Sequence, residues 1–391
     1  MSRRKRQRVL NKLNYRNIPL VDYALGATVL GLTLFGILMV YDTSVIVAFE
    51  RFGDRLWFLK NQAMWAFIGI GVGFIVSGID YKFWRKLANP MLAVSLVMLI
   101  LVFVPGFSSD EYTLNQRLVF PSGLPFLEYL FIQPSEVVKL TLVIYLAHLF
   151  DSAKATATGR IKNKFNLPHW QFLVVTGLVV VLVAIEPDQG NALLIAASAF
   201  VVYFTAGAPL LFTIGLGGVG ILAALAYALS SDYRRERLLT FLNPLADPQG
   251  ASYQITQILL ALGSGGLLGL GLGNSRQKYQ YIPEVTTDSI FAVIGEELGL
   301  IGASLVIAAL FFVIWRGFKI AAQTQDEFGR LLAIGLSANI GLQAIVNLGG
   351  MVGLLPLTGV PLPFVSYGGS SLTLLLVSIG ILLSISRSVE S

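Results

Sequence analysis

The chain has 391 residues, of which 55% are hydrophobic and only 13% are charged, and its formal net charge is +6. A soluble protein of this size needs roughly a quarter of its residues charged, so the composition excludes one. The chain holds no cysteine and two histidines, which excludes disulfides, thiol catalysis and metal centres built from thiolates or several imidazoles. We therefore predict an all-α, polytopic membrane protein with about ten transmembrane helices.

Apolar segments long enough to cross ~30 Å of hydrocarbon recur along the chain. They lie at about 21–41, 62–79, 88–105, 133–150, 170–186, 189–206, 208–230, 287–315, 328–350 and 364–386. We expect a basic cytoplasmic tail at 1–20, a membrane domain at 21–386 and a short cytoplasmic tail at 387–391. Within the membrane domain, the polar stretch 231–286 is predicted to be a large extracellular loop between helices 7 and 8.

The placement of lysine and arginine predicts the orientation. With the N-terminus inside, the expected cytoplasmic segments carry 18 basic residues, counting Arg330 at the start of the 328–350 span, and the outer loops carry nine. Lys139 is the one basic residue left, deeper within a span. Cytoplasmic loops of membrane proteins are enriched in basic residues, so both termini are expected in the cytoplasm. The same asymmetry explains the positive net charge without nucleic acid as a partner.

Glu136 and Lys139, in the sequence QPSEVVKL, are charged residues inside a predicted span. Pro134 suits the first turn of a helix, and positions three apart share one helix face. A charge at this depth costs a few kcal/mol or more unless it is paired or faces water. Two compatible interpretations stay open, namely an ion pair that holds helices together and the wall of a polar cavity reached from outside.

Asp188 lies in EPDQGNA, at a very tight outer turn between two spans. The structural interpretation is a proline turn with Asp188 capping the next helix, because aspartate accepts hydrogen bonds from free N–H groups at a helix start. The alternative is that Asp188 binds a cation or sugar hydroxyls.

Asp288 follows Thr286 and Thr287 at the outer end of a span, in KYQYIPEVTTDSIFAVIGEELG. The plain interpretation is a helix cap. Thr287 could cap alone, which would leave Asp288 facing a cavity, with Glu296 two turns deeper in the same helix. A carboxylate at a membrane–water boundary suits proton abstraction from a substrate hydroxyl. From these residues alone, catalysis, ion coupling and a plain cap all stay open.

The segment GLLPLTGVPLPFVSYGGSS, residues 353–371, breaks an outer loop with three prolines and two paired glycines. Irregular backbone at membrane depth is tolerated only where it is buried or lines a cavity. We therefore expect Ser366, Gly368 and Gly369 to line the same polar site.

These motifs together resemble one family. The ordered set QPSEVVKL, EPDQGNA, NPLADPQGASYQ, QKYQYIPEVTTDSIFAVIGEELG and PLPFVSYGGSS is similar to the SEDS proteins (shape, elongation, division and sporulation), over about residues 20–387. The resemblance implies a ten-span fold and a peptidoglycan glycosyltransferase that polymerises lipid II on the outer face of the cytoplasmic membrane. It is nearer to the division branch (FtsW-like, septal wall) than to the elongation branch (RodA-like).

The resemblance also implies roles for the candidate residues. It places the family's catalytic aspartate at Asp288 and its helix-four Glu and Lys at Glu136 and Lys139. The pyrophosphate leaving group should face cations, since it accumulates negative charge. The expected supporting residues are Glu136, Lys139, Asp188, Arg237, Lys278, Glu296, Ser366, Gly368 and Gly369, with Lys139 and Arg237 first toward the pyrophosphate.

The expected partners follow from the same resemblance: lipid II, the nascent glycan, a class B penicillin-binding protein and other division proteins at the septum. No protein metal site is predicted, although a divalent cation, Mg²⁺ or Mn²⁺, could share the charge of the leaving group. The main alternative is a flippase for a lipid-linked substrate, which would use the same intramembrane charges. It is disfavoured because the sequence shows no internal repeat and its polar features gather on the outer side.

Overall fold

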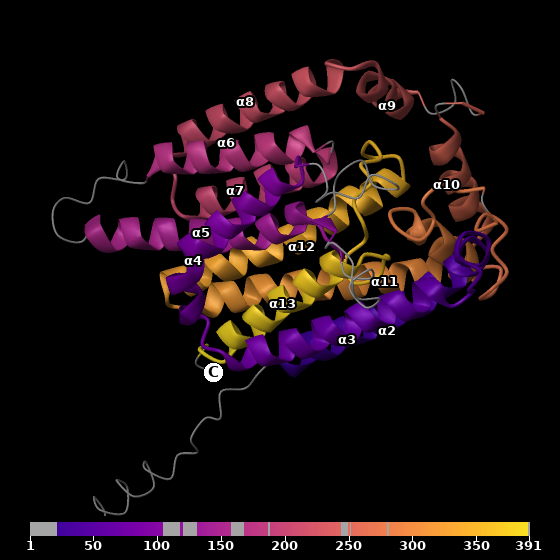
Figure 1. Ribbon diagram of the computed structural model, residues 1–391, viewed down its shortest axis with the longest axis horizontal. Coiled ribbons are helices and arrows are strands. Elements are labelled where there is room, and N and C mark those ends of the chain that lie inside the picture. Colours follow the sequence, from indigo (N-terminus) through magenta and orange to yellow (C-terminus); the bar gives the residue numbers. More distant parts are fainter. Residues whose placement is uncertain are drawn as a thin grey trace, which may run out of the picture.

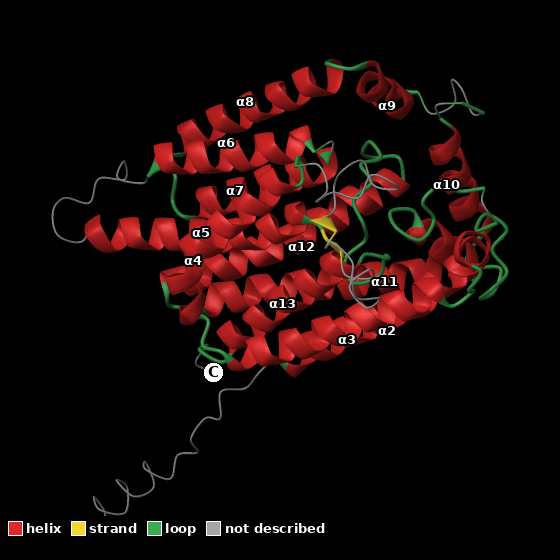
Figure 2. Cartoon of the chain, viewed as in Figure 1, coloured by secondary structure: helices red, strands yellow, loops and turns green. Residues whose placement is uncertain are grey.

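The computed structural model describes residues 22–104, 118–119, 131–157, 168–186, 188–243, 249–250, 252–279 and 281–389. Its helices are α2 (Tyr23–Phe52), α3 (Trp57–Gly78), α4 (Lys82–Leu101), α5 (Pro134–Ala157), α6 (His169–Ile185), α7 (Gln189–Thr205), α8 (Leu210–Leu229), α9 (Asp232–Leu242), α10 (Tyr253–Ser264), α11 (Ile290–Gln323), α12 (Glu327–Met351) and α13 (Gly369–Ser386). One antiparallel pair joins β1 (Leu118–Val119) to β2 (Phe131–Ile132). The all-α prediction is confirmed, as Figure 2 shows.

Each of the ten predicted apolar segments falls on a helix, and the chain is a multi-pass membrane protein. Seven described helices are long and apolar enough to cross a membrane, namely α2, α3, α4, α8, α11, α12 and α13. Two more, α6 and α7, are apolar but shorter, and α5 carries the charged pair Glu136 and Lys139. The count of ten spans therefore stays a prediction, as do the boundaries of the two cytoplasmic tails.

The helices run back and forth between two ends of a bundle, which we name after one aspartate at each. At the Asp22 end, Asp22 before α2 contacts Arg316 of α11 and Ser386 of α13. At the Asp288 end lie α9, α10, the start of α11 and the segment that precedes α13, on the right in Figure 1. All the candidate site residues lie toward this second end.

Glycines let the central helices approach closely. A Cβ atom on Gly73 of α3 would lie 2.7 Å from the carbonyl oxygen of Leu376 of α13, and one on Gly380 would meet the carbonyl of Gly73. Small residues are typical of helix contacts in membranes, where backbones can pack without side chains between them. Helices α12 and α13 are the most buried of the seven candidate spans, whereas α8 is almost entirely exposed.

Helix α11 is interrupted at Gly299, whose φ of 67° is left-handed. The interruption frees the carbonyls of Glu296 and Glu297, which accept hydrogen bonds of 3.0 Å each from the backbone N–H groups of Leu270 and Gly271. Buried backbone groups need such partners. The glycine-rich loop after α10 therefore folds back onto the first turns of α11 and fixes the chain that leads to Asp288.

Candidate active site

Asp288 lies immediately before α11, and its side chain is only 7% exposed. The helix begins at Ile290 with Ser289 in the capping position, and no side chain makes the capping hydrogen bond. The single proton of the Thr287 hydroxyl is instead shared among the carbonyl and the carboxylate of Glu284, at 3.1 Å each, and the Asp288 carboxylate at 3.4 Å. The interpretation of Asp288 or Thr287 as a helix cap is therefore wrong, and another role has to account for this buried carboxyl group.

The surroundings of Asp288 favour its protonated form. Burial, and secondarily the neighbouring Glu284 carboxylate, raise the pKa of Asp288 to about 7, although the Arg237 guanidinium acts in the opposite direction. No salt bridge to Asp288 occurs in the described part of the chain. A carboxyl group with a pKa near the working pH is suited to act as a general base.

The segment around Asp288 is held by hydrogen bonds from three other parts of the chain, two of them to its backbone. Asn347 of α12 donates to the carbonyl oxygen of Asp288 at 2.8 Å, and the N–H of Tyr367 donates to the carbonyl of Thr286 at 2.9 Å. From α10, Gln254 donates to the hydroxyl of Ser289 at 3.3 Å. These hydrogen bonds fix the position of the segment that carries the Asp288 carboxyl group.

Glu136 and Lys139 form a salt bridge of 2.7 Å with side chains 3% and 2% exposed, which confirms the ion pair. The Lys139 ammonium also donates to Asn191 at 3.0 Å and to Gln343 at 3.4 Å. Buried charges need such additional hydrogen bonds. The pair thus links α5 to α7 and α12.

Asp188 caps α7, because its Oδ1 accepts from the N–H of Asn191 at 3.2 Å. Its Oδ2 accepts from Gln133 at 3.0 Å, Ser135 at 2.8 Å and the amide of Asn191 at 2.8 Å. The capping interpretation is confirmed. Because Asn191 also binds Lys139, Asp188 and the buried ion pair belong to one polar network.

Lys278 lies at a different place, tied to Asp42 of α2 at 2.8 Å and to Glu297 of α11 at 2.9 Å. Glu296 accepts hydrogen bonds from the hydroxyl of Ser275 and from the N–H of Arg276, the latter at 3.1 Å. These contacts anchor the loop before Asp288 to α11 and α2. A direct role for Lys278 or Glu296 toward a substrate stays a prediction.

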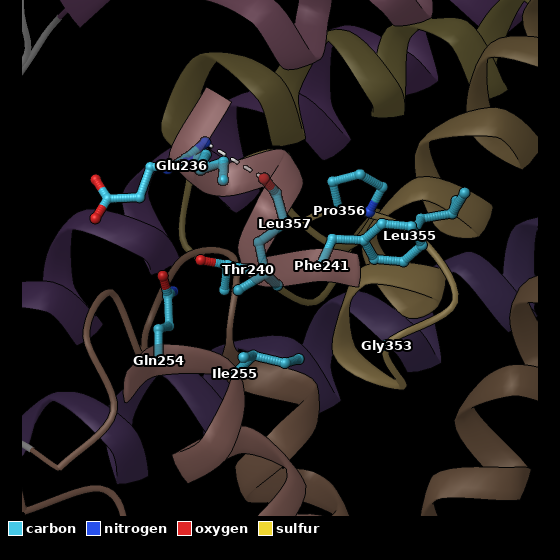
Figure 3. Close-up of a pocket in the computed structure, with 10 residues that line it drawn as sticks. Glu236, Thr240, Phe241, Gln254, Ile255, Gly353, Leu355, Pro356 and Leu357 are labelled. Atoms are coloured by element: carbon cyan, nitrogen blue, oxygen red, sulfur yellow. Dashed lines mark hydrogen bonds between the residues drawn. The ribbon is translucent and has the colours of Figure 1, made fainter. Parts of the chain in front are cut away.

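A cavity of about 220 Å³ lies between α9, α10 and the segment before α13 (Figure 3). It is lined by Glu236, Arg237, Thr240, Phe241, Gln254, Ile255, Gly353, Leu355, Pro356 and Leu357. Arg237 donates to the carbonyl of Leu357 at 3.3 Å, and Gln254 connects the cavity to Ser289. An aromatic ring, aliphatic side chains and a few polar groups are the usual lining of a small-molecule site.

Ser366, Gly368 and Gly369 are all positioned by α3. Gln62 donates to the carbonyl of Ser366 at 3.2 Å and accepts from the N–H of Gly368 at 3.3 Å. A Cβ on Gly369 would collide with the indole of Trp65. These three residues therefore shape the backbone of the segment next to Asp288. Whether they bind a substrate stays a prediction.

Sequence reasoning missed the amides of this site, above all Gln343 and Asn347 of α12, together with Gln62 and Asn191. The available signal was the spacing of Gln343 and Asn347, four residues apart in an apolar helix, which puts two amides on one face at membrane depth. As for metals, the described residues contain no group of three or more His, Asp or Glu side chains that would hold an ion.

A family model described as cell cycle protein, covering FtsW, RodA and SpoVE, matches residues 23–391. The chain belongs to this family. A relative from Geobacter sulfurreducens, a probable peptidoglycan glycosyltransferase FtsW, is 38% identical over 97% of this chain and 98% of its own. Stage V sporulation protein E of Bacillus subtilis is 37% identical over 94% of this chain and 97% of its own. The resemblance to the SEDS family is thereby confirmed.

Two solved structures share the fold. One is a chain of a peptidoglycan synthase complex that coordinates polymerization and crosslinking, with 26% identity, a TM-score of 0.72 and coverage of 94% of this chain and 98% of that one. The other is the rod shape determining protein RodA of Thermus thermophilus, with 24% identity, a TM-score of 0.66 and coverage of 97% and 99%. The second likeness concerns the fold alone.

Proposed function

We propose that the protein is a peptidoglycan glycosyltransferase of the division type, which polymerises lipid II into glycan strands, with Asp288 as its general base. The observation that carries this proposal is a buried carboxyl group that makes no salt bridge within the described residues, has a pKa of about 7 and is connected through Ser289 and Gln254 to a cavity. The FtsW relatives, which are named as probable peptidoglycan glycosyltransferases, support the reaction class.

The chemistry follows from the position of this group. The 4-hydroxyl of an incoming lipid II attacks the anomeric carbon of the growing glycan, the new C–O bond forms, and the bond to the lipid pyrophosphate breaks. Asp288 takes the proton of the attacking hydroxyl, and the electron pair leaves with the pyrophosphate. A positioned base of this kind contributes about 10²- to 10⁴-fold in rate.

The leaving group requires positive charge. Arg237 lines the cavity and acts on Asp288 electrostatically, so we assign it to the pyrophosphate. Lys139 and Lys278 are both held by carboxylates, and we assign them to support. A divalent cation fits this site as a companion of the substrate, because Mg²⁺ is commonly bound by one or two carboxylates together with substrate phosphates.

We further propose that the Asp288 end faces the outside and that both termini are cytoplasmic, at the division septum. The distribution of basic residues supports this orientation. A cysteine introduced at Gln249 should react with an impermeant thiol reagent on intact cells, while one at Lys319 should not. The opposite pattern would overturn the placement of the active site. The peptidoglycan synthase complex supports a transpeptidase partner, a class B penicillin-binding protein.

The reaction itself is tested with purified protein and lipid II. We expect glycan polymer from the wild type and a loss of at least 100-fold in Asp288→Asn, because the amide cannot accept the proton. Asp80→Asn, a change at the other end of the bundle, is the matched control and should polymerise normally. A flippase would make no polymer in any of the three proteins, and normal synthesis by Asp288→Asn would refute the assignment of the base.

A further inference from the structure

Two side-chain amides of α12 face the segment that precedes α13. Gln343 is fully buried and Asn347 is 3% exposed, and the two lie one helical turn apart. Each donates to a backbone carbonyl of consecutive residues in that segment: Asn347 to Val360 at 2.8 Å and Gln343 to Pro361 at 3.0 Å. The helix therefore holds two successive carbonyls of an irregular segment.

Asn347 makes a second contact, which reaches the proposed base. Its Nδ2 also donates to the carbonyl oxygen of Asp288 at 2.8 Å. An amide nitrogen carries two protons, so both donors are used and the orientation of the group is fixed. One side chain thus joins the segment of Val360 to the residue that carries the carboxyl group, although the three positions are distant in sequence.

The acceptor of the same amide is unsatisfied. The Oδ1 of Asn347 is buried and makes no hydrogen bond to any described residue. A buried acceptor without a partner is unfavourable for stability, whereas an apolar residue of the same shape would avoid this cost. The residue at this position is therefore poorly explained by packing and well explained by the two carbonyls that it holds.

Gln343 extends the connection to the buried ion pair. Its Oε1 accepts from Lys139 at 3.4 Å, and Lys139 is bound to Glu136. A continuous series of contacts therefore runs from Glu136 and Lys139 through Gln343 and the 360–361 backbone to Asn347 and Asp288.

We infer that Asn347 is a positioning residue for Asp288, and that the Glu136–Lys139 pair supports catalysis through Gln343 and this segment rather than by touching the substrate. The inference rests on the proposed glycosyltransferase activity. Its physical basis is geometric, since a displacement of about 1 Å in a catalytic group can cost about 10²-fold in rate.

The test compares Asn347→Ala with Asn339→Ala. Asn339 is a matched control on the same helix, because it is 6% exposed and its Oδ1 is also buried without a partner, yet it makes no hydrogen bond to the 352–368 segment. With lipid II as substrate, Asn347→Ala should lower kcat by 10- to 100-fold with little change in KM. Asn339→Ala should have the kcat and the KM of the wild type. The midpoint of the pH profile should stay in place, because Asn347 does not touch the carboxylate.

Two more variants keep the test decisive. Asn347→Ser retains one donor and should recover part of kcat. This variant also allows the test to be made if Asn347→Ala does not fold. Gln343→Met keeps the volume but removes both hydrogen bonds, and it should lower kcat as Lys139→Met does, with no further loss in the double variant. Wild-type kcat in folded Asn347→Ala and Asn347→Ser would overturn the inference, as would equal losses in the Asn339 control. Absence of polymer from the wild type would instead refute the proposed function.

Discussion

The two ends of the helix bundle differ in how exposed their charged side chains are to solvent. At the Asp22 end, oppositely charged side chains pair and the basic partner stays partly open to solvent, although the Asp22 side chain itself is only 4% exposed. Asp22 binds Arg316 at 2.6 Å, and Glu327 binds Lys154 at 2.6 Å and Arg330 at 2.7 Å, with the basic side chains 26–44% exposed. Pairs of this kind contribute about 0–1 kcal/mol each. They join the ends of neighbouring helices without a large desolvation cost.

At the Asp288 end, charged groups are buried instead. The Glu136–Lys139 pair is at most 3% exposed, Lys278 lies between two carboxylates, and Asp288 has no salt bridge in the described part of the chain. The Asp54–Lys60 pair between α2 and α3 is the exception at this end, with side chains 39% and 66% exposed. Burying charges is expensive even when they are paired. Stability alone therefore does not explain the buried charges at this end of the bundle.

The largest expected effect comes from breaking the buried pair. Lys139→Met leaves Glu136 buried without its cation and should destabilise the protein by about 3–5 kcal/mol. Thermal unfolding in detergent measures this loss. The double variant Glu136→Leu with Lys139→Met should recover most of the stability while polymerisation stays low. A double variant that polymerises normally would mean that the pair is purely structural.

A second effect concerns the pH dependence of Asp288. Its folded pKa of about 7 lies above the ordinary value of 3.8, so folding binds a proton between these values and loses stability as the pH rises from about 4 to 7. A shift of about three units corresponds to about 4 kcal/mol as an upper value. Asp288→Asn should therefore raise Tm at pH 8 but not at pH 4. An equal Tm difference at both pH values would contradict the burial argument.

The same group sets the activity profile. Only the deprotonated carboxylate can accept a proton, so kcat/KM of the wild type should fall about tenfold per pH unit below pH 7 and level off above it. Initial rates of polymerisation between pH 5 and 8.5 check this. A flat profile across this range would show that Asp288 does not take the proton in the rate-limiting step.

The smallest effect is expected at the Asp22 end. Arg330→Ala removes a partly exposed partner of Glu327 and should cost no more than about 1 kcal/mol. The loss should shrink further at high salt because surface charges are screened. Activity should be unchanged. A loss as large as that of Lys139→Met would erase the contrast between the two ends.

The sequence was sufficient for the helical fold because the length and apolar character of each segment are local properties. It also predicted where Asp288 lies, since a carboxylate before an apolar span is visible without a structure. Burial of that carboxyl group was not predictable, because it depends on α10, α12 and the segment before α13 closing around it. Lys278 shows the same limit. In a basic loop it resembled a cation open to substrate, but its partner Asp42 is 236 positions away.

The interruption of α11 at Gly299 also affects how the protein opens locally. Residues 265–273 contain five glycines, a composition usually associated with rapid local motion. Here the amides of Leu270 and Gly271 are bonded to carbonyls of α11, while the side chains of Leu267 and Leu268 point outward, 67% and 79% exposed. Hydrogen exchange of these amides then requires separation from the helix. The glycine-rich loop should exchange as slowly as the first turns of α11, as one cooperative unit with them.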